Sequence, residues 1–400
     1  MHLTSDHPFW GVSNGLVRSY PSLRNSLRCD CLVVGGGITG ALVGYHLAAA
    51  GVDTVVVDRR DIGMGSTSGS TGLLQYEVDV PLRDLREKVG AKAANRSYLL
   101  CREAIYKLEA LVQKHGIRCG FKLRPSLQVA RHRGEVDEMK REFSLRRELG
   151  IELEFWGEAE LRKHFPFAKP AALFSRDGAQ VDPHSMMHGV LLAGMKRGLQ
   201  VFDRTKVSKF RSTRNGIVAS MEGGFNITAR RAVVAAGFES GTFLRGKAGQ
   251  LKSTYALISE PVESLRSWFR QALIWETGIP YLYLRTLPDN RVIVGGEDEP
   301  FVNSLRRDKL IQEKTRVLMR KFGRLFPDIR LEVAYAWAGT FGQTKDGLPY
   351  IGTHENEPHI YFALGYGGNG ITYSLIAAEI IRDDFLGRRN RDLRLFRFDR

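Results

Sequence analysis

Residues 31–58 read CLVVGGGITGALVGYHLAAAGVDTVVVD, and this stretch decides the fold. The apolar run at 32–34 has the length of a buried parallel strand. A glycine-rich turn follows, then an alanine-rich segment at helical spacing that ends at Gly51. A second apolar run delivers Asp58. Strand, glycine turn, helix, strand and acid in this order form the dinucleotide-binding fingerprint.

Each position of the turn has a physical reason. Gly35 permits the tight turn off the strand, Gly37 lets the backbone approach a diphosphate, and Gly40 lets the helix pack closely on the strand. The helix start offers free N–H groups and a partial positive charge to phosphates. Asp58 lies 18 residues after Gly40, where a carboxylate can accept hydrogen bonds from ribose hydroxyls. The sequence therefore predicts a nucleotide site.

Length and charge set the bounds of the interpretation. The chain has 400 residues, 43% of them hydrophobic, which suffices for two or three domains with ample core. Its formal net charge of +15 would suit a nucleic acid, but the basic residues are scattered. The densest groups, Arg141 with Arg146-Arg147 and residues 388–400, are typical of an exposed helix face and a tail. We therefore expect a solvated basic surface and no nucleic-acid partner.

The cysteines and the N-terminal segment indicate the cellular compartment of the protein. The four cysteines form no CxxC pair and have no zinc-ligand spacing, so we expect buried free thiols in a reducing compartment and no metal site. The first 27 residues lack an apolar signal core, and no apolar run is long enough to span a bilayer. These observations favour a cytoplasmic protein without a membrane partner. The N-terminal segment is expected to lie extended on the body, anchored by Phe9 and Trp10.

Hydrophobic periodicity predicts the remaining elements. Helices are expected over 82–118, 134–149, 186–198, 308–322 and up to Arg382, and strands over 121–130, 201–202, 205–210, 217–221, 225–228, 232–236 and 360–363. Residues 250–336 alternate as β-structure does, and the turn at 288–290 is expected to join two of its strands as a hairpin.

Three further segments could approach the same ligand. Residues 63–72 are mostly Gly, Ser and Thr, and their hydroxyls and amides can line a diphosphate and a ribityl chain. Residues 235–237 end a buried strand with glycine, which permits another close backbone approach. Residues 365–372 read GYGGNGIT and open a second helix, whose N-terminus can face the other end of a long cofactor.

Together these segments resemble the flavin-dependent D-amino acid oxidase family, most closely its glycine/sarcosine oxidase branch. The matching pieces are GGGITG with Asp58, GSTSGSTGLL at 65–74, VDP at 181–183, AAG at 235–237, TKDGLPYIG at 344–352 and GYGGNGI at 365–371. They occur in the family's order and extend over nearly the whole chain from Cys31.

The resemblance implies an α/β fold: a Rossmann-like FAD-binding domain of the glutathione reductase type and an antiparallel-sheet α+β substrate domain. The FAD domain would comprise residues 1–85, 172–247 and 337–400, and the substrate domain residues 86–171 and 248–336. The FAD contacts implied by similarity are Gly35, Gly37, Ile38, Thr39, Gly40, Asp58, Arg59, Ser66, Thr67, Thr71, Gly72, Leu73, Val207, Gly237, Tyr366, Gly367, Gly368, Asn369, Gly370, Ile371 and Thr372.

The departures from the family pattern matter as much. Where sarcosine oxidases carry a flavin-tethering cysteine, this chain has Gly339, so non-covalent FAD is predicted. Where amino-acid-oxidising relatives carry a carboxylate-binding arginine, it has Phe341, and a further candidate position has Gly368. The strand at 292–294 lacks a lysine resembling an oxygen activator. Oxygen or another electron acceptor therefore stays open, as does the choice between oxidase and dehydrogenase.

The predicted reaction is oxidation of a C–H bond next to an amine, in an amino acid or related amine, by hydride transfer to flavin N5. Tyr283 and Arg285 are the catalytic candidates, because alternation places them on one face of a strand. Arg285 could pair with an anionic substrate group that Tyr283 orients. A surface arginine beside a half-buried tyrosine fits the same pattern. Gln75 and Tyr76 are weaker candidates.

Two alternatives stay open. An enzyme acting on a tRNA-borne amine would suit the net charge, although the chain shows no clustered basic and aromatic patch. A flavin-binding protein without turnover would explain the missing arginine. A nicotinamide enzyme is a weaker option, because only one dinucleotide fingerprint is present.

Overall fold

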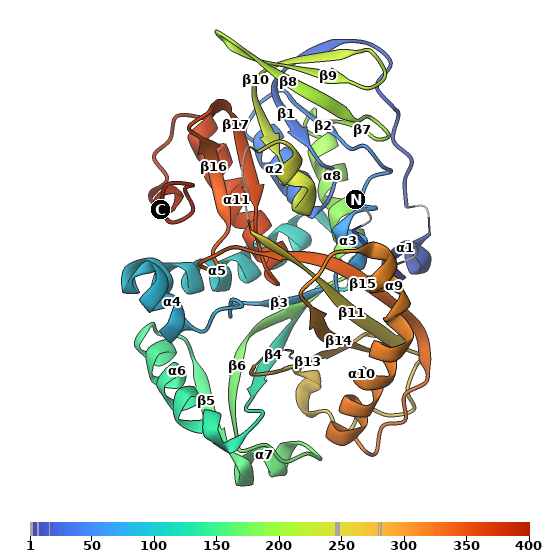
Figure 1. Cartoon of the computed structure of the whole chain (residues 1–400), viewed down its shortest axis with the longest axis vertical. Helices are drawn as coiled ribbons and strands as arrows, with labels where there is room; N and C mark the ends of the chain where they lie inside the picture. Colours follow the sequence, from blue (N-terminus) through green and yellow to red (C-terminus); the bar gives the residue numbers. More distant parts are fainter. Residues whose placement is uncertain (1–2, 6–7, 16, 245–248, 279, 281) are drawn as a thin grey trace.

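The computed structural model describes residues 3–5, 8–15, 17–244, 249–278, 280 and 282–400. Its strands form two sheets, one of eight strands and one of nine. Figure 1 shows the eight-stranded sheet in the upper half of the molecule and the nine-stranded sheet in the lower half. Both sheets, with helices packed on them, make the mixed α/β fold that the sequence predicts.

The eight-stranded sheet is built on the fingerprint, and β1 lies at its centre. Its path runs β16 (Tyr350–His354), β17 (Glu357–Leu364), β10 (Asn226–Val234), β1 (Leu27–Val34), β2 (Thr54–Val57) and β7 (Gln200–Phe202), while β8 (Val207–Thr213) and β9 (Gly216–Met221) attach to β10 as a hairpin. From β17 to β7 the strands are parallel. The two short strands expected at 225–228 and 232–236 are one continuous strand, β10.

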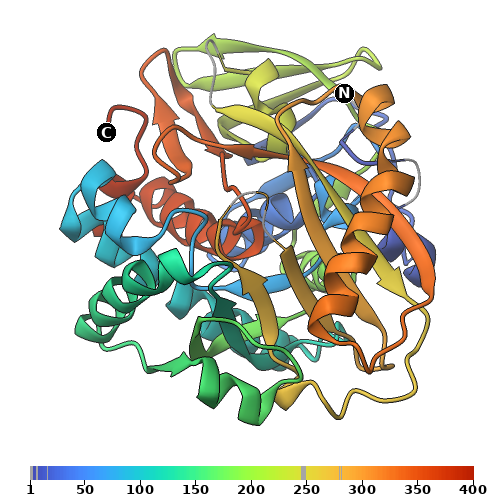
Figure 2. The same cartoon turned by 60° about the horizontal axis from the view of Figure 1, so that its bottom comes forward.

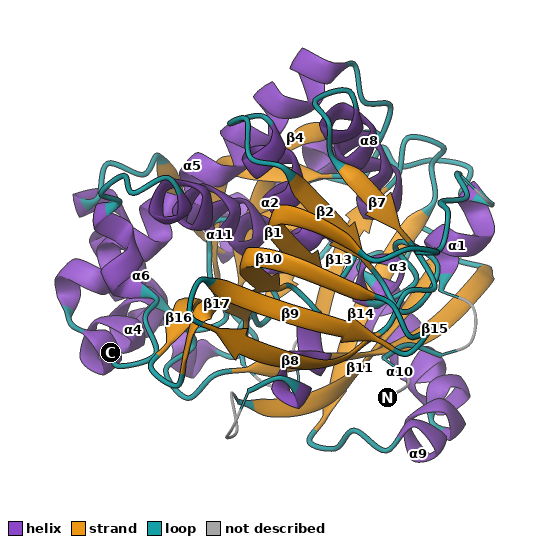
Figure 3. Ribbon diagram, turned by 90° about the horizontal axis from the view of Figure 1, so that it is seen from above, coloured by secondary structure: helices purple, strands orange, loops and turns teal. Residues whose placement is uncertain are grey.

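Both faces of this parallel sheet are covered, which explains its continuous apolar strands. One face packs against α2 (Ile38–Ala48), α8 (Pro183–Met195) and α11 (Gly370–Phe385), and α5 (Ala91–His115) packs on α8 and α11. The β8–β9 hairpin covers the other face, and Figure 3 shows it across the strands from these helices. Val33 points to the helices, while Leu32 and Val34 point to the hairpin. Successive side chains of β1 thus pack into two separate hydrophobic cores, one on each face of the sheet.

The nine-stranded sheet carries the second half of the molecule. Its path runs β15 (Val333–Gln343), β11 (Gln250–Ser259), β14 (Val292–Glu299), β13 (Leu282–Thr286), β12 (Leu273–Glu276), β4 (Lys122–Val129), β6 (Ala171–Gln180) and β3 (Leu73–Gln75), with β5 (Leu153–Gly157) on β6. The expected hairpin around residues 288–290 is confirmed by the antiparallel β13–β14 pair. Figure 2 shows α10 (Ile311–Leu325) lying along this sheet, where Leu318 and Phe322 are buried.

Sheet membership differs from the predicted domain boundaries at three strands. β3, β6 and β15 belong to the nine-stranded sheet, although residues 73–75, 172–180 and 337–343 were assigned to the FAD domain. These strands are the places where the chain passes from one half of the molecule to the other. The two-domain division therefore stays a prediction.

Two predicted helices have different bounds, for local reasons. The expected helix at 82–118 is interrupted at Gly90, whose φ of 83° separates α4 (Leu82–Val89) from α5. α8 begins before residue 186, because Asp182 Oδ1 accepts hydrogen bonds from the backbone N–H groups of His184 (2.9 Å) and Ser185 (3.0 Å).

The N-terminal segment is partly helical, over α1 (Phe9–Asn14), where an extended segment was expected. Trp10 is nevertheless an anchor, since its indole is buried and donates a hydrogen bond to the Ser70 carbonyl at 2.6 Å. All four cysteines are free thiols, three buried and Cys29 half-buried. Within the described residues, no helix combines the length and the apolar character needed to cross a membrane.

The expectation that Arg146 lies on an exposed face is wrong. On α6 (Val136–Glu148) its side chain is fully buried, with Nη2 2.8 Å from Glu142 Oε1 and Nη1 3.5 Å from Glu77 Oε1. It lies over the rings of Tyr76 and Tyr98, each 5.7 Å away. Sequence periodicity predicts a charged helix but does not distinguish Arg146 from its neighbour Arg147, which is exposed as expected. The burial of Arg146 could therefore not be predicted from this pattern.

We expect Arg146→Ala to lower the free energy of unfolding by roughly 3–5 kcal/mol, because Glu142 and Glu77 would keep buried charges without their partner. Chemical denaturation measures this loss. Arg147→Ala is the matched control and should change stability by no more than about 0.5 kcal/mol. Equal effects of the two substitutions would show that the buried pair adds nothing.

Candidate active site

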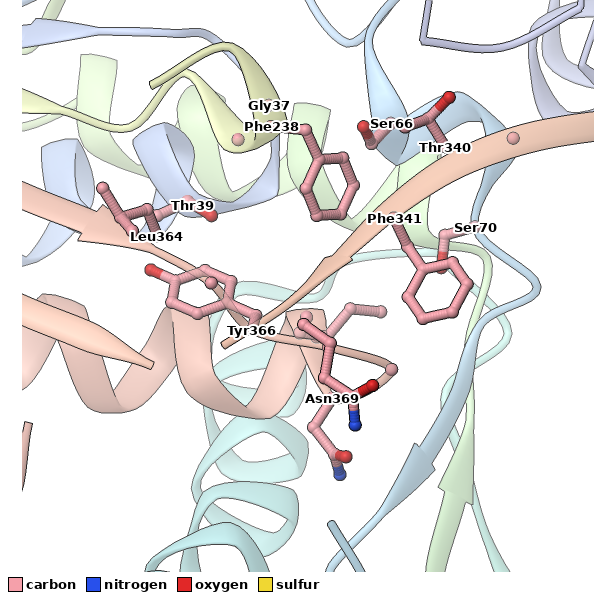
Figure 4. A pocket seen from close by; sticks show the side chains of 18 of the residues that line it. Gly37, Thr39, Ser66, Ser70, Phe238, Thr340, Phe341, Leu364, Tyr366 and Asn369 are labelled. Atoms are coloured by element: carbon pink, nitrogen blue, oxygen red, sulfur yellow. The ribbon is translucent and has the colours of Figure 1, made fainter. Parts of the chain in front are cut away.

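A cavity of about 1120 Å³ lies between the two sheets and takes its lining from both. This volume slightly exceeds the roughly 300–1,000 Å³ that is typical of ligand pockets. The predicted FAD contacts that line it are Gly35, Gly37, Ile38, Thr39, Asp58, Arg59, Ser66, Thr67, Thr71, Leu73, Val207, Gly237, Tyr366, Gly367, Gly368, Asn369, Gly370 and Ile371. Figure 4 shows side chains from distant segments, including Thr39, Phe341 and Tyr366, pointing into this space.

Three predicted contacts lie behind the lining. A Cβ on Gly40 would lie 1.8 Å from the Gly35 carbonyl oxygen, so Gly40 serves the close packing of α2 on its turn. Gly72 lies against the Val181 carbonyl, which a Cβ would approach to 2.2 Å. Thr372 is buried and donates a hydrogen bond to the Asn369 carbonyl at 3.0 Å. These residues shape the cavity wall from outside.

The first glycine turn presents the start of α2 to the cavity. Gly35 has a φ of 113°, which a residue with a side chain rarely adopts. Thr67 Oγ1 accepts a hydrogen bond from the Ile38 N–H at 3.0 Å and so ties the loop after β2 to the helix start. Beside it, the buried Ser66 Oγ has no hydrogen-bond partner among the described residues. This corner offers donors to an anionic ligand.

Asp58 is held rigidly at the end of β2. Its Oδ2 accepts from the Gly36 N–H at 2.7 Å and its Oδ1 from the Arg60 N–H at 2.8 Å. Burial raises the pKa of this carboxyl, and the two backbone hydrogen bonds oppose that effect. Arg60 also pairs with Glu239 at 2.9 Å. The acid is thus fixed at the cavity wall, as a ribose-binding residue requires.

Three side chains hold the loop at 66–72 by three consecutive carbonyl groups. Trp337 Nε1 donates to the Gly69 carbonyl at 2.9 Å, and Trp10 Nε1 donates to that of Ser70 at 2.6 Å. Arg285 Nε donates to the Thr71 carbonyl at 2.7 Å. The loop therefore has a fixed conformation, although its Gly, Ser and Thr residues alone would allow many.

Arg285 does not line the cavity. Its side chain is 1% exposed, and Nη2 donates a second hydrogen bond to the Val181 carbonyl at 3.0 Å. Burial lowers its pKa to about 9. Its Nε and Nη2 atoms donate to backbone carbonyls and the residue is absent from the cavity lining, so this placement does not support the predicted pairing with a substrate anion. Arg285 is instead a residue that positions the loop.

The second glycine turn presents the start of α11 to the same cavity. Asn369 Nδ2 donates to the carbonyls of Gln75 (3.0 Å) and Glu77 (2.9 Å), which joins the turn to the end of β3. Thr39 Oγ1 and Ser374 Oγ are 2.7 Å apart, so α2 and α11 are hydrogen-bonded near their starts. The amides of the first turn of each helix lack intrahelical acceptors. Two positive helix ends therefore face one space.

The nine-stranded sheet supplies the opposite wall. Tyr283 from β13 lines it as predicted, with Lys252 and Thr254 from β11, Phe341 from β15 and Asp298 from β14. The Tyr283 ring lies across Gly295, where a Cβ would be 2.3 Å from Cζ. Burial raises the pKa of Tyr283 to about 12, so the hydroxyl stays protonated.

Sequence reasoning missed Asp298 because a β-bulge aims it into the cavity. Between the pairs Tyr255↔Gly296 and Ser253↔Glu299, β14 has one residue more than β11. Glu297 takes a φ of 57° there and pairs with Lys321 on α10, on the far side of the sheet. Simple alternation from Gly295 would have pointed residue 297 into the cavity. The bulge places Asp298 there instead.

The cavity fits FAD on observations of its own residues. The glycine turn allows a ligand to approach the backbone closely. In addition, the Ser66 Oγ and Gln75 Nε2 atoms are buried without hydrogen-bond partners among the described residues. Residues 30–383 match the family described as "DAO: FAD dependent oxidoreductase". The chain belongs to this family. It is therefore an FAD-dependent oxidoreductase, and FAD is its cofactor.

Relatives and solved structures agree with this assignment. The glycine oxidase of Bacillus subtilis (strain 168) is 26% identical over 93% of this chain and 97% of its own length. The gamma-glutamylputrescine oxidoreductase of Escherichia coli (strain K12) is 25% identical over 94% of this chain and 89% of its own. The crystal structure of glycine oxidase from Geobacillus kaustophilus superposes with a TM-score of 0.75 at 21% identity, covering 91% of this chain and 96% of that one.

We expect Gly37→Glu to give a colourless protein. A Cβ there would lie 3.0 Å from Thr67 Oγ1, and the added carboxylate would repel a diphosphate at the start of α2. Flavin absorbance of the purified protein is the measurement. Gly134→Glu is the matched control, because Gly134 is exposed with nothing within 4 Å of its Cβ position. A yellow Gly37→Glu protein would contradict this placement of the diphosphate.

Proposed function

We propose that this enzyme oxidises a carbon–hydrogen bond next to an amine in a small amine or amino-acid-like substrate. The observation that carries the proposal is that one cavity joins the nucleotide corner at Gly37 to a polar wall with Tyr283 and Asp298. The glycine oxidases and the gamma-glutamylputrescine oxidoreductase among the relatives support this class of reaction. When bound, FAD supplies the acceptor for the two electrons and the hydrogen that leave the carbon.

The chain's own residues prepare the amine. An amine is oxidised in its neutral form, so its ammonium must first lose a proton. Asp298 is the carboxylate of the wall that can take it, held by a hydrogen bond from Thr254. Tyr283 contributes a protonated hydroxyl that can orient the substrate. Phe341 and Trp275 cover the same space with aromatic rings and limit access of water.

The start of α11 acts on the cofactor's other end. Asn369 fixes the turn to β3, so the amides of Gly370 and Ile371 are preorganised at the cavity wall. Such a helix start stabilises negative charge that develops on a neighbouring group during reaction. No reorganisation of the protein is then needed when the cofactor is reduced.

FAD is proposed to be held without a covalent bond. None of the four cysteines, all of which are described, lines the cavity, and Gly339 lies in the wall. We expect acid precipitation to release all yellow colour into the supernatant, as absorbance of the two fractions measures. Colour that stays with the precipitated protein would contradict this proposal.

No observation on the described residues favours the alternatives from the sequence. Several carboxylates, among them Glu135 and Glu138, line the cavity together with basic residues, so its lining is not the uniformly basic surface that suits an RNA backbone. The polar wall with Asp298 argues against a flavin-binding protein without turnover. The electron acceptor, oxygen or another compound, is part of the proposal and is tested by reoxidation of the reduced protein in air or with quinone dyes.

We expect the rate of anaerobic flavin bleaching by a reactive amine to rise with pH through about 6 and then level off. Burial raises the pKa of Asp298 to about 6; the charges of Asp79 and Glu297 raise it too, while Thr254 and Lys252 lower it. Only the ionised carboxylate accepts the proton, so activity is lost as the pH falls below this value. Rapid mixing without oxygen measures the profile.

Variants test the assignment of this step. Asp298→Asn should lower the bleaching rate about 10²–10⁴-fold and remove the rise near pH 6. Glu297→Gln, which removes a charge from the opposite side of the strand, should keep the rise and move it to a slightly lower pH, because Glu297 is one of the charges that raise the pKa of Asp298. An unchanged profile in Asp298→Asn would contradict the role of this carboxylate. Absence of bleaching by every amine and amino acid tried would contradict the proposed function itself.

A further inference from the structure

The substrate-facing part of the cavity is acidic. Three carboxylates that line it, Glu77, Asp79 and Asp298, are here called the acidic wall. They come from two segments: the one after β3 supplies Glu77 and Asp79, and the bulge of β14 supplies Asp298. The basic residues that line the nucleotide corner, Arg59, Arg60 and Lys206, are each paired with a glutamate of the same lining, Glu239 or Glu222. They therefore do not offset the charge of the acidic wall.

Glu77 presents a buried carboxylate to the cavity. The residue is 5% exposed, and its Oε1 accepts a hydrogen bond from Ser126 at 3.3 Å and lies 3.5 Å from Arg146. Its Oε2 is buried without a hydrogen-bond partner among the described residues. A buried carboxylate oxygen without a partner is costly, so a cationic donor in the cavity would satisfy it.

Asp79 occupies the space next to the second glycine turn. Its Oδ2 accepts a hydrogen bond from the Gly368 N–H at 2.9 Å. A Cβ on Gly368 would lie 2.7 Å from Asp79 Oδ1, so a side chain at 368 and this carboxylate exclude each other. The cavity wall beside the second glycine turn thus carries the negative charge of Asp79. A basic side chain at position 368 would instead place a positive charge there.

The remaining charges leave this region negative, because Arg146, the partner of Glu77, is shared with Glu142, which lines the cavity as well. Lys252 interacts with both Asp79 and Asp298, but one ammonium cannot neutralise two carboxylates. Arg285 is committed to the carbonyls of Thr71 and Val181. In the described lining on this side, Arg83 is already paired with Glu138 at 2.9 Å. A substrate carboxylate would meet like charges here, whereas a substrate cation would meet partners.

We propose that the acidic wall selects substrates with a second cationic group and no carboxylate, that is, diamines or polyamines. This inference rests on the proposed amine oxidation. The reacting amine is presented to Asp298 for deprotonation, while the other ammonium is bound by Glu77 and Asp79, and the aromatic lining at Phe341 and Trp275 suits both the methylene chain and the cation. The same charges exclude α-amino acids by repulsion, which is how a site discriminates against a competitor.

The experiment compares three ligands of equal chain length on the yellow holoenzyme. 1,4-Diaminobutane carries two cations, butylamine one, and 4-aminobutanoate a cation and an anion; glycine and sarcosine are added as amino acids. Dissociation constants come from the concentration dependence of anaerobic bleaching and from ligand-induced shifts of the flavin spectrum. We expect 1,4-diaminobutane to bind at least about tenfold more tightly than butylamine, and the compounds with a carboxylate to bind more weakly still.

Substitutions in the acidic wall test which carboxylates cause the preference for a ligand with two cations. Asp79→Asn retains an oxygen for the Gly368 N–H, and together with Asp298→Asn it should reduce the advantage of 1,4-diaminobutane over 4-aminobutanoate about tenfold or more. Glu297→Gln is the matched control: it removes a charge one residue from Asp298, on the side facing Lys321, and should keep the advantage. Thermal unfolding confirms that each variant is folded, and Asp298→Glu should restore the preference if Asp298→Asn is unstable.

The outcomes separate the two levels of the proposal. Tighter binding of glycine, sarcosine or 4-aminobutanoate than of 1,4-diaminobutane would overturn the inference, as would equal ligand preferences in Asp79→Asn, Asp298→Asn and Glu297→Gln. Spectral binding of 1,4-diaminobutane with the expected preference, but without bleaching by any compound, would support the cation site and contradict the proposed oxidation.

Discussion

The hydrogen bond between Thr39 and Ser374 joins the starts of two helices that are more than 300 residues apart in the sequence. Because α2 and α11 are held together near their N-termini, the amides of both first turns face the same cavity. An elongated cofactor can then be bound at its diphosphate by one helix and near its ring by the other. The rest of the molecule is arranged around this pair, with the parallel sheet behind it and the nine-stranded sheet opposite.

The loop between the two helix starts owes its conformation to distant side chains. Trp10, Trp337 and Arg285 come from three separate parts of the chain, yet they bind the consecutive carbonyls of residues 69–71. Arg285 also lies 5.6 Å from the Trp10 ring, so two of the three support each other. A loop of flexible composition thus has one fixed conformation. The conformational entropy that it loses is offset by hydrogen bonds from distant residues, which the sequence of the loop alone does not reveal.

The fingerprint at 31–58 could be interpreted from sequence because each of its requirements is local. The positive φ of Gly35 and the close approach of Gly40 to the Gly35 carbonyl are what the glycine spacing predicts. The role of Arg285 could not be predicted, because alternation gives the face of a strand but not the partner across the sheet. Asp298 was missed for a related reason: one extra residue in β14 reverses which side chains face the cavity. Arg146 looked exposed because its pairing with Glu142, four residues earlier on the same helix, is typical of a solvent-facing helix, whereas its second partner Glu77 meets it only in three dimensions.

The most direct test is a crystal structure of the yellow protein with its FAD. We predict the diphosphate at the N–H groups of Gly37 and Ile38, and the isoalloxazine ring beside the amides of Gly370 and Ile371, with Asp298 across the cavity from the ring. A ring located away from the start of α11, or a diphosphate bound elsewhere than at the start of α2, would contradict this prediction.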